Sequence, residues 1–106
     1  MNTKRFVGLC ALFVVLSGAL FAGQAQAADP NNGAKLYNMH CTGCHGPRGK
    51  GAMPGMPDFS RGQSLLVADA SLVTTLERGG GMMPAYRGLL STQEMLDVIA
   101  HLRTFQ

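Results

Sequence analysis

The sequence predicts a small all-α domain, with about three main helices separated by long loops rich in glycine and proline. Three observations lead to this prediction. Apolar residues recur at helical spacing in three separate segments. Each of these segments begins with a residue that commonly caps helices, and nowhere after the first 27 residues does the chain alternate like a half-buried strand. The chain has 106 residues, which suits a single domain.

The first 27 residues have the three parts of a secretory signal peptide. A basic pair opens the segment, residues 6–23 carry no charge, and the Ala-Gln-Ala of residues 25–27 is a small-x-small cleavage site. We therefore expect residues 1–27 to be cleaved and residues 28–106 to form the mature domain in the periplasm. The alternative is an uncleaved membrane anchor, although 18 uncharged residues are at the short limit for crossing a bilayer.

Loss of the signal peptide changes the charge and the cysteine content. Two of the nine basic residues are lost, which leaves seven against six acidic residues and a net charge of about +1. No basic run remains, so the composition does not support nucleic-acid binding. Cys41 and Cys44 are the cysteines that remain, and a disulfide between them would close too small a loop to stabilise the domain much. Because so short a chain has a marginal core, we expect another group to fill its interior.

The first helix is expected to begin at Pro30, with Asp29 as its N-cap, and to run into Cys41. Asp is a favoured N-cap residue, and Pro suits the first helical position because it lacks the amide hydrogen that would be unpaired there. The apolar residues of this helix are Ala34, Leu36, Tyr37 and Met39.

The later elements follow from local signals in the same way. Residues 46–63 are so dense in glycine and proline that we expect no regular element there. The middle helix is expected to begin with Asp69 as N-cap and to end at Gly79. The last helix begins with a capping box, in which Ser91 is the N-cap and Glu94 the third helical residue. Its apolar stripe consists of Met95, Val98, Ile99 and Leu102.

The chemistry of this chain is concentrated in residues 41–45, Cys-Thr-Gly-Cys-His. Structural zinc takes four ligands, commonly as two pairs, and the chain has no second pair. A redox C-x-x-C belongs at a helix start in a βαβ setting, whereas this one follows a helix. C-x-x-C-H is the attachment signal of c-type haem. The motif therefore favours Cys41 and Cys44 as covalent tethers of one haem c, with His45 as the proximal iron ligand.

The second axial ligand is expected to be a methionine, because His/Met ligation is typical of electron transfer. The candidates are Met39, Met53, Met56, Met82, Met83 and Met95. Met39 and Met95 lie on expected helices, where packing in the core is the simpler role. The next two follow His45 by only 8 and 11 residues, too few to reach the opposite haem face. Met82 and Met83 lie in a glycine-rich segment that permits close backbone approach, and this reasoning leaves both open.

The C-x-x-C-H motif, the Met-Pro-Ala-Tyr of residues 83–86 and the capped last helix together resemble the class I cytochrome c family. The resemblance is strongest to the small bacterial monohaem members and covers residues 29–106. It implies a small domain wrapped around one covalently attached haem. It also implies that Met83, with Met82 as second choice, is the distal iron ligand, and that Gly33 and Tyr37 pack across the last helix.

The same resemblance suggests further residues around the haem. Pro57, with Pro54 as second choice, is expected to accept the Nδ1 proton of the proximal histidine. Phe59 and Tyr86 are expected to line the haem pocket. His101 stands where the family often has an aromatic residue in the last helix, and its imidazole is expected to replace that ring in the helix contact.

The resemblance implies a periplasmic electron carrier rather than an enzyme, because two axial ligands leave no position for a substrate. The expected partners are periplasmic redox proteins or membrane oxidoreductases, with no nucleic acid and no stable membrane insertion after cleavage. One alternative is a dedicated haem subunit of a larger periplasmic oxidoreductase. Another is a haem ligand sensor or peroxidase-like enzyme with a labile sixth ligand.

Overall fold

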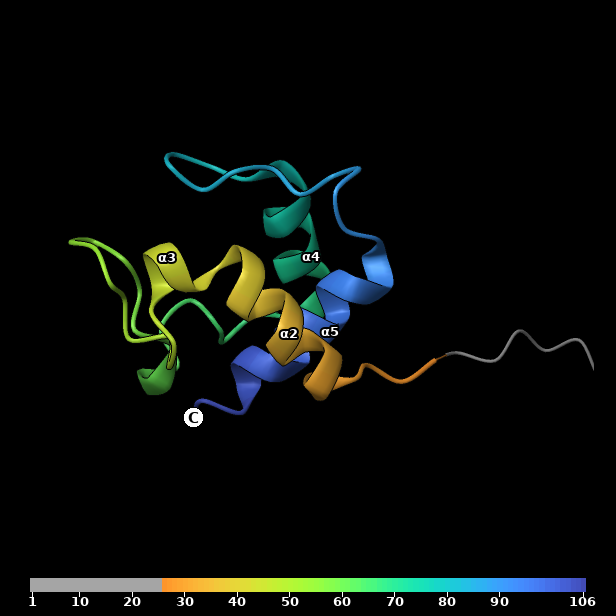
Figure 1. The fold of residues 1–106 in the computed structure, drawn as a ribbon, viewed down its shortest axis with the longest axis horizontal. Helices are drawn as coiled ribbons and strands as arrows, with labels where there is room; N and C mark the ends of the chain where they lie inside the picture. The colour runs from red at the N-terminus through yellow and green to blue at the C-terminus, as the bar shows by residue number, and fades with distance from the viewer. Residues whose placement is uncertain (1–25) are drawn as a thin grey trace, which may run out of the picture.

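A computed structural model describes residues 26–106, so the predicted signal peptide lies almost wholly outside the described residues. Over this range the chain forms four α-helices and one 3-10 turn, with two isolated β-bridges and no strand. Figure 1 shows the helices gathered at the centre, with residues 46–58 and 79–90 as two long loops at the periphery. The predicted all-α class is confirmed. No helix within residues 26–106 has the length and apolar character that a bilayer span requires.

Helix α2 spans Pro30–His40 and begins as its sequence predicts. The Asp29 carboxylate accepts a hydrogen bond from the amide of Asn31 at 2.8 Å, and this satisfies an amide that has no partner within the helix. The buried residues of α2 are Gly33, Leu36 and Tyr37. The expectation that Met39 packs in the core is wrong: its side chain is 67% exposed, because it lies off this helical stripe.

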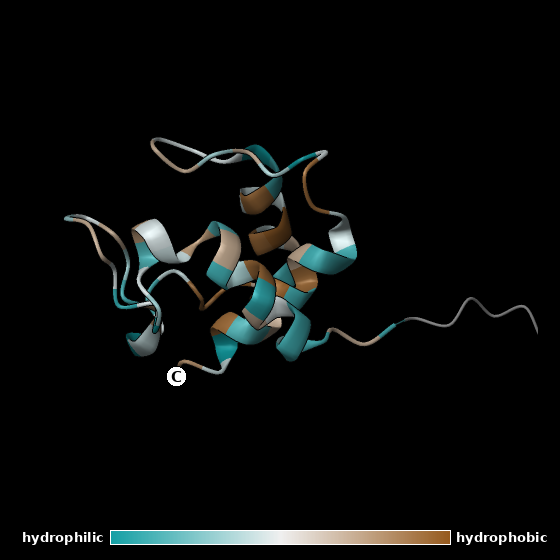
Figure 2. Cartoon of the chain, in the orientation of Figure 1, coloured by the Kyte–Doolittle hydropathy of each residue, from teal (hydrophilic) through white to brown (hydrophobic). Residues whose placement is uncertain are grey.

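Helix α5 spans Thr92–Arg103 and has the predicted capping box. The Ser91 hydroxyl accepts from the Glu94 amide, and the Glu94 carboxylate accepts from the Ser91 amide. The predicted apolar stripe of Met95, Val98, Ile99 and Leu102 is buried. It forms the centre of the core, which Figure 2 shows in brown where the helices meet.

Helices α2 and α5 cross with their backbones in contact. A Cβ atom on Gly33 would overlap the backbone carbonyl of Asp97, so only glycine permits this approach. The Tyr37 ring meets the His101 ring edge-on at 5.4 Å, and His101 meets Phe105 in the same way at 4.8 Å. The imidazole of His101 therefore takes part in an aromatic contact between the two helices, as expected.

Helix α4 spans Asp69–Arg78 and differs from its prediction at the start. Ala68 is the N-cap and makes no side-chain cap bond, while Asp69 is the first helical residue. The Asp69 carboxylate instead pairs with Arg103 of α5 at 2.5 Å, which explains why it does not cap its own helix. Gly79 ends α4 as predicted, with a φ of 63° that suits glycine.

The segment 46–63 contains one short regular element, contrary to expectation. Phe59–Arg61 forms a single 3-10 turn, η1, whose N-cap Asp58 accepts from the Ser60 amide at 3.0 Å. The Phe59 amide donates to the Gly49 carbonyl at 2.7 Å, which closes the loop on itself. This bond fixes the buried Phe59 side chain against the rest of the fold.

Candidate haem pocket

A cavity of about 600 Å³ opens between the helices and the two long loops. Its volume is typical of sites for small molecules and cofactors. Helices α2, α4 and α5, the short helix α3 (Thr42–His45) and both loops all contribute residues to its wall. The cavity is lined by all eight residues that the sequence selects from three separate segments: Cys41, Cys44, His45, Pro57, Phe59, Met82, Met83 and Tyr86.

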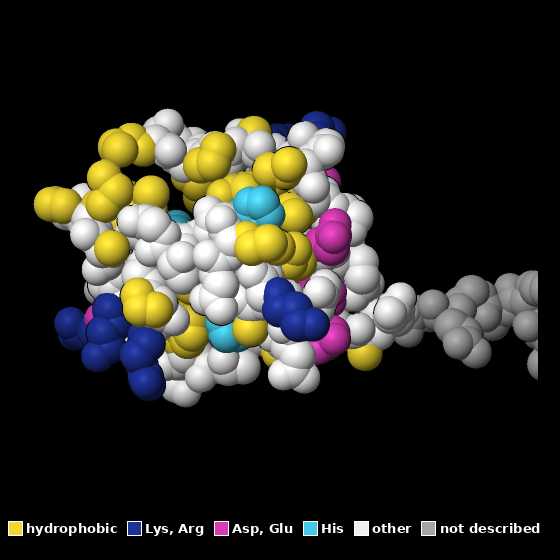
Figure 3. Space-filling model, viewed as in Figure 1, with side chains coloured by type: hydrophobic (Ala, Val, Ile, Leu, Met, Phe, Trp, Pro, Cys, Tyr) yellow, Lys and Arg dark blue, Asp and Glu magenta, His cyan; other side chains and the backbone are white. Residues whose placement is uncertain are grey.

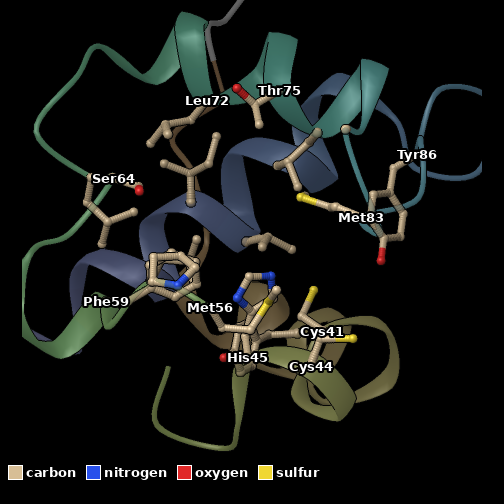
Figure 4. A pocket seen from close by; sticks show the side chains of 18 of the residues that line it. Cys41, Cys44, His45, Met56, Phe59, Ser64, Leu72, Thr75, Met83 and Tyr86 are labelled. Carbon is tan, nitrogen blue, oxygen red and sulfur yellow. The ribbon is translucent and has the colours of Figure 1, made fainter. Parts of the chain in front are cut away.

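Cys41 lies at the break between α2 and α3, and Cys44 is on α3. The His45 amide donates to the Cys41 carbonyl at 2.9 Å, so the break and the short helix hold the motif in one fixed turn. Both cysteines are free thiols, and Figure 4 shows them side by side at the cavity. Burial, and then the neighbouring Cys44, raises the pKa of Cys41 to about 11.

This thiol chemistry bears on the alternatives to haem. A reactive C-x-x-C has a lowered thiol pKa, and the raised pKa of Cys41 is the opposite. Within the described chain, no group of three or more His, Cys, Asp or Glu side chains is placed to hold a metal ion. Neither a thiol-redox centre nor a structural zinc site fits these residues.

His45 projects from the end of α3 into the cavity, and its ring stacks on Phe59 at 4.9 Å. Burial lowers its pKa, which favours the neutral imidazole. Its Nδ1 atom is buried and has no hydrogen-bond partner among the described residues. The bond expected to the Pro57 carbonyl, or to that of Pro54, is therefore not formed. The imidazole is therefore positioned by its stacking on Phe59 rather than by a hydrogen bond at Nδ1.

Met83 approaches the cavity from the other side. Figure 4 shows its thioether and the imidazole of His45 pointing into the cavity from opposite walls. Met83 is half-buried and packs on the core, whereas Met82 is 74% exposed. Gly80 and Met83 exchange two backbone hydrogen bonds of 3.0 Å, which form a tight turn after α4. A Cβ on Gly79 would lie 2.5 Å from the Met83 carbonyl, so this turn needs glycine.

Tyr86 connects the methionine loop to the cysteine motif. Its hydroxyl donates to the His40 carbonyl at 3.0 Å, and its amide donates to the Leu76 carbonyl at 2.9 Å. The ring is buried, and burial raises the pKa of the phenol. Tyr86 therefore fixes the loop that carries Met83 to the end of α2, one residue before Cys41.

Several wall residues were not selected from the sequence. Leu65 is 1% exposed and lines the cavity, yet it follows a loop with no periodicity to indicate burial. It is held by Arg103, whose guanidinium donates to the Leu65 and Val67 carbonyls at 3.0 Å each. Leu72 and Leu76 recur at helical spacing in α4, but only the tertiary arrangement turns them toward the cavity.

The residues present fit a haem c. Two thiols lie where covalent tethers are needed, a neutral imidazole and a thioether face each other across the cavity, and leucine, valine and isoleucine side chains form much of the wall. Imidazole and thioether are the axial donor pair of electron-transfer cytochromes. The apolar wall suits a porphyrin and keeps water away from its centre.

Comparison with known proteins agrees with this reading of the cavity. The family described as cytochrome c oxidase, cbb3-type, subunit III, matches residues 28–102. The chain is 30% identical to cytochrome c6 of Thermosynechococcus vestitus over 100 residues, which is 92% of this chain and 88% of that protein. It is 28% identical to cytochrome c6 of Nostoc over 102 residues, 92% of this chain and 90% of the relative.

A further relative is the cbb3-type cytochrome c oxidase subunit FixP of Bradyrhizobium diazoefficiens. It is 36% identical over 78 residues, which cover 69% of this chain but only 27% of that longer protein. The family match and the cytochrome c6 relatives span nearly the whole described domain. The chain therefore belongs to the class I cytochrome c family, and with its single C-x-x-C-H motif it takes one covalently bound haem c.

Proposed function

We propose that this protein is an exported monohaem electron carrier, not an enzyme, with His45 and Met83 as the two axial ligands of its haem iron. The observation that carries the proposal is the placement of the His45 imidazole and the Met83 thioether on opposite walls of one apolar cavity. The haem supplies one-electron chemistry between Fe(III) and Fe(II). With both axial positions taken by the chain, no position is open for a substrate.

The remaining site residues bind and shield the group. Cys41 and Cys44 would form the two thioether tethers, and their position at the break between α2 and α3 would hold the haem beside His45. Phe59 covers the face of the His45 ring, while Pro57 and Tyr86 close the wall. These side chains orient the ligands and exclude water, and both effects tune the reduction potential.

Met83 is preferred to Met82 as the distal ligand for a reason that the fold supplies. Met82 is 74% exposed, while Met83 packs on the core and faces the cavity. Pro84 follows directly, so the chain has little freedom to rotate Met82 into the same place. Met82 stays the second choice.

The setting we propose is the periplasm. Cleavage of the signal peptide after Ala27 would release residues 28–106 there, with a net charge of about +1. The electron donor and acceptor would be periplasmic redox proteins or membrane oxidoreductases, which the carrier meets through a small, short-lived interface.

The experiment compares Met83→Ala with Met82→Ala in the haem-loaded protein. Methionine ligation keeps the reduced iron six-coordinate and low-spin and raises the potential. We expect Met83→Ala to give a high-spin reduced spectrum and a lower midpoint potential, because the distal ligand is lost. Met82→Ala removes an exposed neighbour and should change neither measurement. Unchanged spectra in Met83→Ala would overturn the assignment.

A second function is favoured by one observation. The matching family is described as an oxidase subunit, and FixP is an oxidase subunit too. On this alternative the domain is a dedicated haem subunit of a larger periplasmic oxidoreductase. Purification from the native membrane separates the two: a freely diffusing carrier elutes alone, whereas a subunit elutes in fixed stoichiometry with its catalytic partner.

A further inference from the structure

Asp97 stands out as a buried charge with no cation beside it. It is 4% exposed and is the one charged side chain that is buried within residues 26–106. Its carboxylate accepts three hydrogen bonds, from the Asp29 amide at 2.8 Å, the Asn32 side chain at 2.8 Å and the Gln93 side chain at 3.0 Å. All three donors are neutral.

The carboxylate is nevertheless ionised. Burial raises the pKa of Asp97, but the three hydrogen bonds together outweigh this effect and hold its pKa below the ordinary value. The ion pairs of the described chain are Arg87–Glu77 and Arg103–Asp69, so none involves Asp97. A buried carboxylate normally pairs with a cation, and the fold between residues 26 and 106 provides none here.

The start of the mature chain lies against this carboxylate. The Asp29 amide is bonded to Oδ1 of Asp97, and Gln93 also donates to the Ala27 carbonyl at 3.5 Å. One residue of chain reaches at most about 3.6 Å, so the Ala28 nitrogen lies within about 6.4 Å of that oxygen. Figure 3 shows acidic side chains gathered where the described chain meets the grey segment.

We propose that Asp97 is the receptor for the mature N-terminus: cleavage after Ala27 releases the amino group of Ala28, which becomes an ammonium and pairs with the buried Asp97 carboxylate. The inference rests on the cleavage site proposed above. Hydrolysis breaks the Ala27–Ala28 peptide bond with one water molecule. The carboxylate leaves with the signal peptide, and the new amine takes up a proton. A neutral amide is thereby replaced by a positive charge.

The surrounding charges favour a cation at this position. Asp29 is the N-cap of α2, and Oδ1 of Asp97 accepts from its amide, so two carboxylates lie at the first residues of the mature chain. An ammonium relieves the repulsion between the carboxylates, which the uncleaved chain cannot do.

The consequence is that cleavage of the signal peptide stabilises the folded domain. Before cleavage, the Gln93 side chain holds the Ala27 carbonyl and Asp97 has only neutral donors. After cleavage, the same carboxylate gains a charged partner at the point where α2 is fixed to α5. The mature protein is therefore more stable than a chain of identical fold whose amino group lies elsewhere.

The experiment measures the pKa of the Ala28 amine by NMR in the reduced haem-loaded protein, after intact mass has established where the chain begins. The ordinary value is about 7.7–8.0. We expect it to be raised by roughly half a unit to one unit, because a carboxylate lies within about 6 Å. Asp97→Asn should return it to the ordinary range, while Glu77→Gln, which removes an equal charge on α4, should leave it raised.

A second variant keeps Asp97 intact and covers the case in which Asp97→Asn does not fold. Gly-Ser inserted before Ala28 moves the amine away from the carboxylate, and its pKa should be ordinary. The stability difference from the native chain should be full below about pH 8 and vanish as the pH rises through the raised amine value. A mass that shows another first residue refutes the cleavage site and this inference together. An ordinary pKa in a chain that begins at Ala28 refutes the inference alone.

Discussion

Neighbouring side chains of this protein have different roles because their surroundings differ. Met82 and Met83 are chemically identical and adjacent, yet one is exposed and the other packs on the core beside the cavity. His40 and His45 flank the cysteine pair, but only His45 is stacked against Phe59, while His40 lies at the exposed end of α2. The residue type limits the chemistry of a side chain. The local fold decides which of two identical residues faces the cavity.

His101 gives a prediction on pH. Burial between the Tyr37 and Phe105 rings lowers its pKa. A histidine with a lowered folded pKa resists protonation, so the unfolded chain binds the proton first and stability falls as the pH drops below about 6.5. We expect the urea midpoint to decrease between pH 7 and pH 5, and His101→Phe to flatten this dependence. An equal decrease in both proteins would contradict this role for His101.

At the level of elements, the sequence predicts a helix start correctly where the residues that determine it lie within one helical turn of each other. The Asp29-Pro30 start of α2 and the Ser91/Glu94 capping box are formed as the sequence predicts. The start of α4 was predicted one residue late, because Asp69 bonds to Arg103, 34 residues away, instead of capping its helix. The burial of Leu65 escaped prediction for the same reason, since Arg103 fixes its carbonyl from a distant helix.

The candidate site likewise has local features that the sequence predicts and contacts between segments that it does not. Cys41, Cys44 and His45 belong to a five-residue motif that sequence alone reveals, and all three line the cavity. The absence of a Pro57 hydrogen bond to Nδ1 could not be foreseen, because it depends on how the loop that follows His45 packs against the imidazole. Contacts between segments, rather than local chemistry, are what the sequence leaves open.

The crossing of α2 and α5 gives a prediction at this scale. Gly33→Ala would place a methyl group onto the Asp97 carbonyl, a backbone atom that cannot move alone. We expect a loss of about 2–3 kcal/mol in the free energy of unfolding, measured by urea titration of the haem-loaded protein. Gly43→Ala in α3 is the matched control: its Cβ meets nothing within 4 Å, and alanine favours a helix by up to about 1 kcal/mol. Equal effects at both positions would contradict the close helix contact.

For the whole molecule, the cavity is large relative to the domain around it. About 600 Å³ of a domain of this size is cavity, and its wall is largely apolar. A chain this short has a marginal core of its own, so we expect the haem to supply part of that core.

Removal of the haem should accordingly unfold the chain. In Cys41→Ala/Cys44→Ala the group cannot be tethered, and we expect far-ultraviolet circular dichroism to show the loss of most helical signal in the haem-free protein. A Cys10→Ala precursor, changed outside residues 28–106, should load haem and fold normally. A haem-free double variant with native helicity and a cooperative thermal transition would show that the core is sufficient without the group.

The apolar stripe of α5 has a consequence for how this protein evolves. Val98, Ile99 and Leu102 belong to the core and also line the haem cavity. A substitution there alters stability and electrochemical behaviour together, so selection cannot adjust one without disturbing the other. The two peripheral loops are less constrained, because many of their side chains face solvent. Divergence among descendants of this chain should therefore accumulate at the exposed positions of residues 46–58 and 79–90, and not at Gly79, Met83 or Tyr86, while the last helix changes slowly.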